Sequence, residues 1–221
     1  TKLSFVNTLM EICHKTGINV DDVTDGLKLA NQRLISPAYL TAGMADGGGC
    51  HPRDNIAMSY LAGKLRLSYD FFDAIMTQRE NSTEWLADGV IAKSNYHENH
   101  SAMKRLLGEP DETLPIHILG KAFKAETNLT VGSPAVLLKN LIEDRTDIKV
   151  VHWDPHVDIQ EHTGRLKVPD WKIGVYFIGT KHEVFKNFKF PKGSIVFDPW
   201  RYLVHLKDED GIEYIPIGGP A

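Results

Sequence analysis

The hydrophobic side chains in the first half of the chain recur at helical spacing. In the opening segment, apolar side chains lie three or four residues apart: Leu3, Val6, Met10 and Cys13. We expect this helix to end near Thr16, because Gly17 is typical of the position that follows a helix C-terminus. A second short helix is expected over residues 21–29, and an apolar helix over about 55–65. Later apolar positions predict one or two long helices that reach towards residue 107: Phe71, Ile75, Trp85, Leu86 and Val90.

Residues 108–112 form an acidic, proline-containing stretch that is typical of a linker. Beyond it, short apolar runs predict four β-strands, over residues 116–120, 149–153, 173–179 and 194–197. An amphipathic helix is expected over residues 134–142, between the first two strands. Strands that alternate with helices favour an α/β fold with a small, doubly wound parallel sheet. The sequence therefore predicts a helical domain over residues 1–110 and a sheet domain over residues 111–221.

The composition is that of an ordinary globular protein, with 42% hydrophobic and 24% charged residues in 221. A formal net charge of −4 provides no basic field for nucleic acid or an anionic membrane, and no apolar run approaches the ~20 residues of a membrane span. The two cysteines, Cys13 and Cys50, lie far apart and no signal peptide opens the chain, so we expect a cytoplasmic protein. Because Thr1 opens a helical pattern without an N-cap, we expect a fragment of a longer protein.

Cys50 lies between three glycines and a predicted helix. Pro52 suits the first turn of a helix, so Cys50 is expected at the N-terminus, where the helix dipole favours a thiolate. Arg53 adds positive charge beside it. This pattern predicts a reactive thiol, although a small residue in a tight turn is an equal alternative from local chemistry alone. Cys13 lies on the apolar stripe of the first helix and is expected to be a buried structural thiol.

Two histidine-containing stretches, residues 97–100 and 152–156, were considered as metal sites. Histidines three residues apart can share one helix face. Neither stretch alone supplies the three or four ligands that zinc prefers. We therefore expect solvated polar residues and no metal at either stretch.

Residues 43–54, Gly-Met-Ala-Asp-Gly-Gly-Gly-Cys-His-Pro-Arg-Asp, resemble the G-x-G-x-G-G-x-C-x-x-[KR]-D signature of the UDP-glucose/GDP-mannose dehydrogenase family. Ala45 replaces the second glycine of that pattern. Three further stretches are similar to later family motifs: residues 118–124 (I-L-G-x-A-F-K), Ser133-Pro134, and Trp153-Asp154-Pro155. Residues 1–7 resemble the start of the family's central helix. The resemblance covers essentially the whole chain and the latter half of a full-length member.

This resemblance implies an NAD-dependent oxidation of the C6 alcohol of a UDP-sugar, UDP-glucose or a UDP-N-acetylhexosamine, to the uronic acid. In the family a cysteine captures the aldehyde as a thiohemiacetal, and loss of hydride gives a thioester that water hydrolyses. The resemblance also implies that the helical half forms a homodimer. The domain that follows it in the chain is implied to be Rossmann-like and to bind the UDP-sugar.

By position in the motifs, the resemblance assigns a role to a dozen residues of this chain. The implied catalytic residues are Cys50 and Asp54. The implied substrate contacts are Arg33, Tyr39, Gly43, Gly47, Phe123, Lys124 and Arg201. The implied cofactor contacts are His51, Pro52 and Arg53. Taken singly, the arginines are equally well explained as surface charges, and Tyr39 and Phe123 as packing residues.

The chain departs from the family pattern in three ways. The sequence lacks the family's N-terminal NAD-binding domain, and it also lacks the catalytic lysine and asparagine that precede the first helix. We therefore expect this fragment alone to be inactive. Val131 stands where the family often has an arginine that contacts the cofactor, which puts cofactor use in question. The alternative prediction is a non-catalytic dimerisation and nucleotide-binding module.

Overall fold

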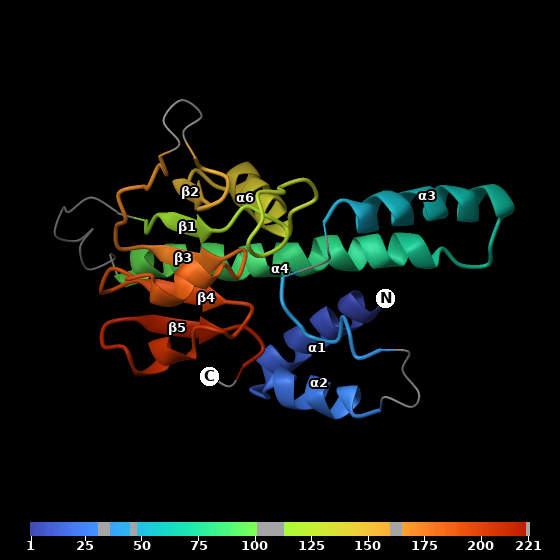
Figure 1. Ribbon diagram of the computed structural model, residues 1–221, viewed down its shortest axis with the longest axis horizontal. Helices are drawn as coiled ribbons and strands as arrows, with labels where there is room; N and C mark the ends of the chain where they lie inside the picture. The colour runs from blue at the N-terminus through green and yellow to red at the C-terminus, as the bar shows by residue number, and fades with distance from the viewer. Residues whose placement is uncertain (31–35, 45–47, 101–112, 160–164, 220–221) are drawn as a thin grey trace.

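A computed structural model describes residues 1–30, 36–44, 48–100, 113–159 and 165–219, with the side chains of 96–100 excepted (Figure 1). Among the described residues, four helices precede the sheet: α1 (Lys2–Thr16), α2 (Val20–Lys28), α3 (Cys50–Leu65) and α4 (Phe71–His100). The elements that follow are β1 (Ile116–Leu119), α6 (Pro134–Arg145), β2 (Val150–Trp153), β3 (Val175–Ile178), η1 (Glu183–Asn187), β4 (Ile195–Asp198), η2 (Val204–Asp208) and β5 (Glu213–Pro216).

The helix ends follow the local signals in the sequence. Gly17 closes α1 in the left-handed conformation, with φ 70°. The side chain of Asn19 accepts a hydrogen bond from the Asp21 amide at 3.1 Å and caps α2. Helix α3 begins at Cys50, five residues before the start expected from its apolar stretch, because Gly49 and Pro52 already allow helical backbone there. Where two helices were an option, α4 is one helix of 30 residues.

The five strands form one parallel sheet in the order β2-β1-β3-β4-β5. The four predicted strands are all present, and the predicted α/β fold is confirmed. The sequence prediction missed β5, because this edge strand is only partly buried and does not read as an apolar run. The β2 edge lies beside α6, and β5 lies at the opposite edge, near α1 and α2 (Figure 1).

Each face of the sheet packs against a different set of elements. On one face, α4 and α6 bury apolar side chains against β1, β3 and β4, and the cluster continues into α1 through Val6 and Met10. The other face carries the 3-10 helices η1 and η2, whose Phe185 and Leu206 are fully buried. One hydrophobic cluster thus joins the helical half to the sheet. The predicted domain boundary at residue 110 lies outside the described residues.

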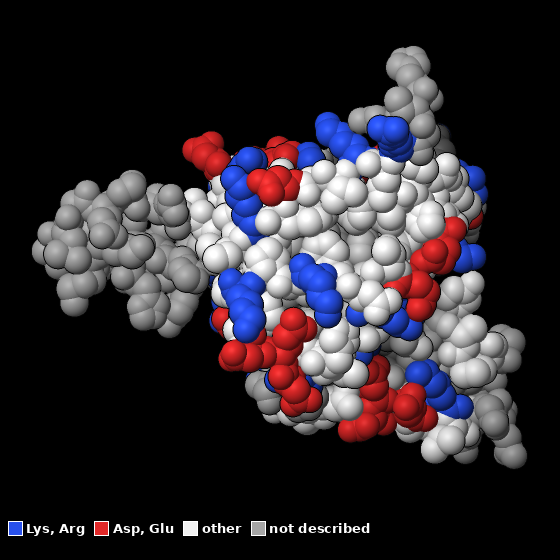
Figure 2. All heavy atoms as spheres, turned by 60° about the vertical axis from the view of Figure 1, so that its left-hand side comes forward, with Lys and Arg blue, Asp and Glu red and all other residues white. Residues whose placement is uncertain are grey.

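The surface of the described residues carries charges of both signs. On the face shown in Figure 2, basic and acidic side chains are interspersed. None of the described helices is both long and apolar enough to cross a membrane.

His117 on β1 is a buried histidine held by aromatic rings instead of hydrogen bonds. Its ring stacks on Tyr176 at 4.5 Å between centroids and meets the edge of Trp171 at 5.7 Å. Neither ring nitrogen has a hydrogen-bond partner among the described residues. Burial lowers the pKa of His117 to about 4, so the ring is neutral at physiological pH. His152 on β2 is half-buried, and desolvation likewise lowers its pKa to about 4.

We predict that the free energy of unfolding falls as the pH drops from about 6.5 to 4. In this range the unfolded chain binds a proton at His117 that the folded chain excludes, which removes roughly 2 to 3 kcal/mol at pH 4. Urea unfolding at a series of pH values measures the effect. His117→Phe, which keeps the aromatic stacking, should flatten the profile by that amount. An unchanged profile in this variant would contradict the assignment.

Candidate active site

The chain reaches Cys50 through a glycine-rich turn that positions the thiol at the start of α3. Gly48 has φ 84°, a conformation that L side chains rarely adopt, and Gly49 is the N-cap residue. The Arg53 amide donates the first helical hydrogen bond, to the Gly49 carbonyl at 3.3 Å. Cys50 is exposed to solvent, whereas Cys13 is buried in α1. An exposed thiol at a helix N-terminus is the arrangement predicted from the sequence.

Arg53 and Asp54 form an ion pair directly beside Cys50. The Arg53 Nε lies 2.8 Å from the Asp54 Oδ1, and both side chains are largely exposed. The hydrogen bond from Arg53 lowers the pKa of Asp54, so this carboxylate is ionised at neutral pH. The same hydrogen bond, followed by the charge on Asp54 and that on Cys50, raises the pKa of Arg53. The helix start therefore holds a cation next to the sulfur atom.

The glycine-rich turn lies directly on the loop that follows β1. A Cβ atom on Gly48 would come within 2.7 Å of the Phe123 ring. A Cβ atom on Gly132, which has φ 73°, would come within 2.4 Å of the Gly49 amide nitrogen. These distances leave no room for a side chain on Gly48 or Gly132. Glycine at both positions thus brings Cys50 and Phe123, residues 73 positions apart in the sequence, to the same place.

Hydrogen bonds fix the shape of the loop that carries Phe123 and Lys124. The Phe123 amide donates to the Leu129 carbonyl at 2.9 Å, and the Thr127 hydroxyl donates to the Lys124 carbonyl at 2.8 Å. The Lys124 side chain is exposed. A cation on an ordered turn at the carboxyl end of a strand is suited to binding an anionic ligand.

Asp154, which follows β2, holds the base of this loop. Its Oδ2 accepts the amides of Lys121 at 2.6 Å and Ala122 at 3.0 Å. Burial would raise the pKa of Asp154, but the hydrogen bonds from His182 and from backbone amides outweigh it and hold the pKa well below the usual range. The carboxylate is fully buried and ionised.

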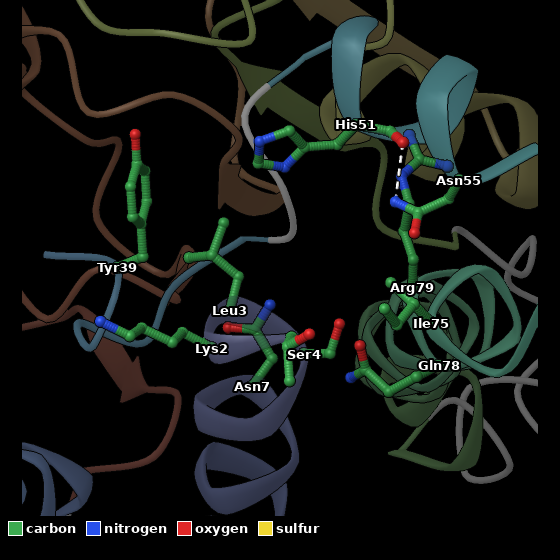
Figure 3. Close-up of a pocket in the computed structure, with 11 residues that line it drawn as sticks. Lys2, Leu3, Ser4, Asn7, Tyr39, His51, Asn55, Ile75, Gln78 and Arg79 are labelled. Carbon is green, nitrogen blue, oxygen red and sulfur yellow. Dashed lines mark hydrogen bonds between the residues drawn. The ribbon is translucent and has the colours of Figure 1, made fainter. Parts of the chain in front are cut away.

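A cavity of about 350 Å³ opens beside the start of α3. Tyr39 lies on one side of it and Asn55 on the other, and the first turns of α1 lie below (Figure 3). His51 projects into the space between them, and its carbonyl accepts a hydrogen bond from Asn55 Nδ2 at 2.8 Å. The structure thus brings together Tyr39 and His51, which the sequence placed in the substrate and cofactor sites. Arg79 of α4 also lines the cavity.

Arg79 and Gly132 are parts of this region that sequence reasoning missed. Arg79 Nη2 donates to the Gly132 carbonyl at 3.4 Å, which links α4 to the loop that packs against the glycine-rich turn. The only local signal was Gly132 itself, because a glycine before a Ser-Pro pair can mark positive φ. Val131, the residue in the position of the family arginine, is 80% exposed beside Gly49.

Arg201 occupies a different environment from the one expected of a substrate contact. Its side chain is 5% exposed and forms a bidentate pair with Asp21, at 2.8 and 3.0 Å. The remaining donors reach the carbonyls of Ala42 at 2.9 Å, Pro199 at 2.6 Å and Ile217 at 2.9 Å. All five N–H groups of the guanidinium are thereby matched by protein acceptors. A substrate contact through Arg201 stays a prediction and would require the exchange of one of these bonds.

The other predicted site residues are placed as follows. Gly43 packs on the ring of Trp200, because a Cβ atom there would lie 2.2 Å from that ring. Pro52 lies in the first turn of α3 and is partly exposed. Arg33 and Gly47 lie outside the described residues. Among the described residues, Tyr39 and His51 line one cavity and Phe123 packs on the turn before Cys50. Arg201 instead bonds to the backbone of Ala42, at the start of the glycine-rich segment.

We predict that Gly132→Ala separates the two loops. The added Cβ atom must displace the Gly49 backbone in a left-handed conformation, so the free energy of unfolding should fall by about 2 kcal/mol. The rate at which a thiol reagent such as DTNB labels Cys50 should change as well. Gly63→Ala is the matched control in α3, where a Cβ atom meets nothing within 4 Å and should stabilise the helix by roughly 0.5–1 kcal/mol. Equal effects of the two substitutions on the free energy of unfolding would refute the close contact between Gly132 and the Gly49 backbone.

Comparison with known protein families matches residues 1–81 to the UDP-glucose/GDP-mannose dehydrogenase family, central domain. The UDP-glucose 6-dehydrogenase YwqF of Bacillus subtilis is 26% identical over 155 residues, or 70% of this chain and 31% of that protein. The UDP-glucose 6-dehydrogenase TuaD of the same organism is 29% identical over 136 residues, or 62% of this chain and 26% of that protein. The aligned part of the chain thus covers less than a third of these relatives.

Solved structures match nearly the whole chain. A UDP-glucose dehydrogenase from Pyrobaculum islandicum has a TM-score of 0.73 at 21% identity, covering 99% of this chain and 48% of that one. A UDP-D-ManNAc dehydrogenase from Pyrococcus horikoshii has a TM-score of 0.67 at 20% identity, covering 98% of this chain and 48% of that one. These similarities establish the shared fold, and the chain spans about half the length of the solved proteins.

Proposed function

We propose that the chain is the central and C-terminal part of an NAD-dependent UDP-sugar 6-dehydrogenase, because residues 1–81 match the UDP-glucose/GDP-mannose dehydrogenase family, central domain. The proposed substrate is UDP-glucose or a UDP-N-acetylhexosamine. The observation that carries the proposal is the exposed thiol of Cys50 at the start of α3, on a glycine turn that packs against Phe123. We also propose a cytoplasmic location, in keeping with the absence of a membrane-spanning helix among the described residues.

Cys50 is the proposed nucleophile. Its thiolate adds to the C6 aldehyde carbon to form a C–S bond, and loss of hydride from that carbon leaves a thioester. Water then attacks the acyl carbon, the C–S bond breaks, and the electron pair returns to sulfur. The positive end of the helix dipole and the charge of Arg53 both lie beside the sulfur atom. Asp54, ionised beside Arg53, is the residue proposed to accept a proton from the attacking water.

NAD, when bound, accepts the hydride from the substrate in each oxidation step. The residues at the start of α3 fit part of this cofactor, because backbone amides at a helix N-terminus and the exposed Arg53 suit an anionic group. His51, Pro52 and Arg53 are the residues proposed to hold it. Val131 presents apolar surface beside Gly49 and supplies no charge there.

The loop after β1 is the proposed site for the UDP part of the substrate. Lys124 provides an exposed cation for the diphosphate, and Phe123 lies against the turn that leads to Cys50. Tyr39 and Gly43 complete the proposed contacts among the described residues, and Arg33, Gly47 and Arg201 are retained from the family resemblance. Binding of the nucleotide at this loop would direct the sugar towards the thiol.

We predict that Cys50→Ala abolishes NADH formation from UDP-glucose by the full-length protein. The loss in turnover should reach about 10³-fold or more, because the covalent step has no other thiol nearby. Absorbance at 340 nm measures the reaction, with a UDP-N-acetylhexosamine as the second substrate. Cys13→Ala is the matched control, since its buried thiol lies in α1 and its loss should leave turnover within about threefold. Wild-type turnover by Cys50→Ala would overturn the mechanism.

The position of Val131 favours one other function, a non-catalytic dimerisation and nucleotide-binding module. Calorimetry with UDP distinguishes the two proposals when it is combined with the turnover assay. UDP binding that is weakened by Lys124→Ala, together with turnover, supports the dehydrogenase. The same binding without turnover on any UDP-sugar supports the module.

We also propose that the chain forms a homodimer through its helical half. Ala62 is the only residue that α3 buries, and the helix lies along the part of α4 that projects from the sheet (Figure 1). Several large apolar side chains on α3 and the turn before α4 are more than half exposed: Ile56, Tyr60, Leu65, Leu67 and Tyr69. An apolar patch of this kind is typical of a subunit interface.

We predict that Tyr60→Glu converts the dimer to a monomer at micromolar concentration. A charge introduced at the centre of an apolar interface is left buried without a partner, which is strongly unfavourable. Sedimentation velocity measures the mass of the particle. Val204→Glu, which changes an equally exposed apolar side chain on η2, is the control and should leave the mass unchanged. A monomeric wild-type protein would refute the proposed interface.

A further inference from the structure

Three loops meet at the carboxyl edge of the sheet and bring together Glu126, His156 and His182. These residues follow β1, β2 and β3, which are neighbours in the sheet. One ligand atom from each residue lies within 4.8 Å of the other two. His156 Nε2 lies 3.2 Å from Glu126 Oε2, and His182 Nδ1 lies 3.5 Å from Glu126 Oε1. The cluster follows the carboxyl ends of β2, β1 and β3, the edge at which such sheets usually bind ligands.

We propose that Glu126, His156 and His182 bind a divalent transition-metal ion, with zinc as the ion that best suits two imidazoles and one carboxylate. Tetrahedral zinc with nitrogen and oxygen ligands at 2.0–2.2 Å places neighbouring ligand atoms roughly 3.3 Å apart. The two histidine–carboxylate separations, which run to different oxygens of Glu126, are already close to this value. Three protein ligands leave a fourth position for water or for an anionic oxygen of a ligand.

A buried carboxylate orients the central ligand of the site. His182 is fully buried, and its Nε2 lies 3.1 Å from the Oδ2 of Asp154, which is also fully buried. Because the Glu126 amide donates to Nδ1 at 2.9 Å, the imidazole proton lies on Nε2, which faces Asp154. Histidines that bind metals usually donate their other ring nitrogen to a carboxylate in this way.

The charge and exposure of the cluster also suit a cation. The Glu126 carboxylate lies close to both imidazoles, and its Oε1 accepts the backbone amide of Glu183 at 2.8 Å. The side chains of His156 and Glu126 are 37% and 51% exposed, which gives an ion a path from solvent. Glu126 would contact the ion directly, whereas Asp154 would act on it only through the His182 ring.

Metal binding requires one local rearrangement. The His182 Nδ1 now accepts the Glu126 amide at 2.9 Å, and a metal ion would take the place of that hydrogen. Glu126 has φ 58° in an exposed turn, and metal binding would require its amide to turn towards solvent and bond to water. The ion would then join the loops after β1, β2 and β3, close to the turn that carries Phe123 and Lys124. This inference does not depend on the proposed dehydrogenase function.

Isothermal titration calorimetry of the untagged full chain with zinc chloride tests the site. We expect one equivalent of zinc per chain, and cobalt(II) should bind there with the intense visible absorption of tetrahedral coordination. Glu126→Gln and His156→Ala should each weaken binding at least about tenfold, because each removes a ligand at the surface. His182 is left intact in these experiments, since it is buried and its replacement would disturb the fold.

His205→Ala is the matched control, because His205 is an exposed histidine on η2 outside the cluster. It should bind zinc as tightly as the wild type. Zinc binding that survives both Glu126→Gln and His156→Ala would place the metal elsewhere and overturn the proposal. Failure of the wild-type chain to bind one equivalent would overturn it as well. UDP binding and turnover are separate measurements, so either proposal can fail without the other.

Discussion

The arrangement of the helical half against the sheet depends on the hydrogen bonds made by the buried guanidinium of Arg201. From a turn after β4 it bonds to Asp21 on α2, to the Ala42 carbonyl in the glycine-rich segment and to the Ile217 carbonyl after β5. A buried charge is tolerated only when it is paired and its donors are satisfied, so this group strongly disfavours any other arrangement of these segments. The glycine-rich segment is thereby held against the end of the sheet.

With that segment fixed, the position of Cys50 follows from sterics and helix electrostatics. Gly48 and Gly132 let the turn and the Phe123 loop touch without side chains between them. The helix that begins at Cys50 directs its positive end at the thiol, and Arg53 adds a charge there. The proposed nucleophile and the proposed nucleotide loop thus become neighbours through backbone contact, although they come from different halves of the chain.

A second polar centre lies at the other side of the same loop. Asp154 receives hydrogen bonds from Lys121, Ala122 and His182, so one buried carboxylate sets the shape of the loop after β1 and orients a histidine of the proposed metal site. His117 shows the contrasting solution, in which a neutral imidazole is buried by stacking on aromatic rings. The hydrogen bonds to Asp154 stabilise its ionised carboxylate, whereas the aromatic surroundings of His117 disfavour protonation of its ring. Both arise from burial, and they differ in the hydrogen-bond donors that the fold supplies.

The sequence by itself determined the elements whose signals are local. The helix end at Gly17, the helix start at Ser133-Pro134 and the four apolar strands follow from backbone preference and burial pattern, and the thiol at a helix start follows from the Gly-Cys-x-Pro order. The edge strand β5 has no such pattern and was missed. Only the tertiary structure decided that Arg201 is saturated by protein acceptors, that Gly132 lies on Gly49, and that Glu126, His156 and His182 converge. These facts depend on contacts between residues far apart in the chain, and no local periodicity or composition records which distant segments will meet.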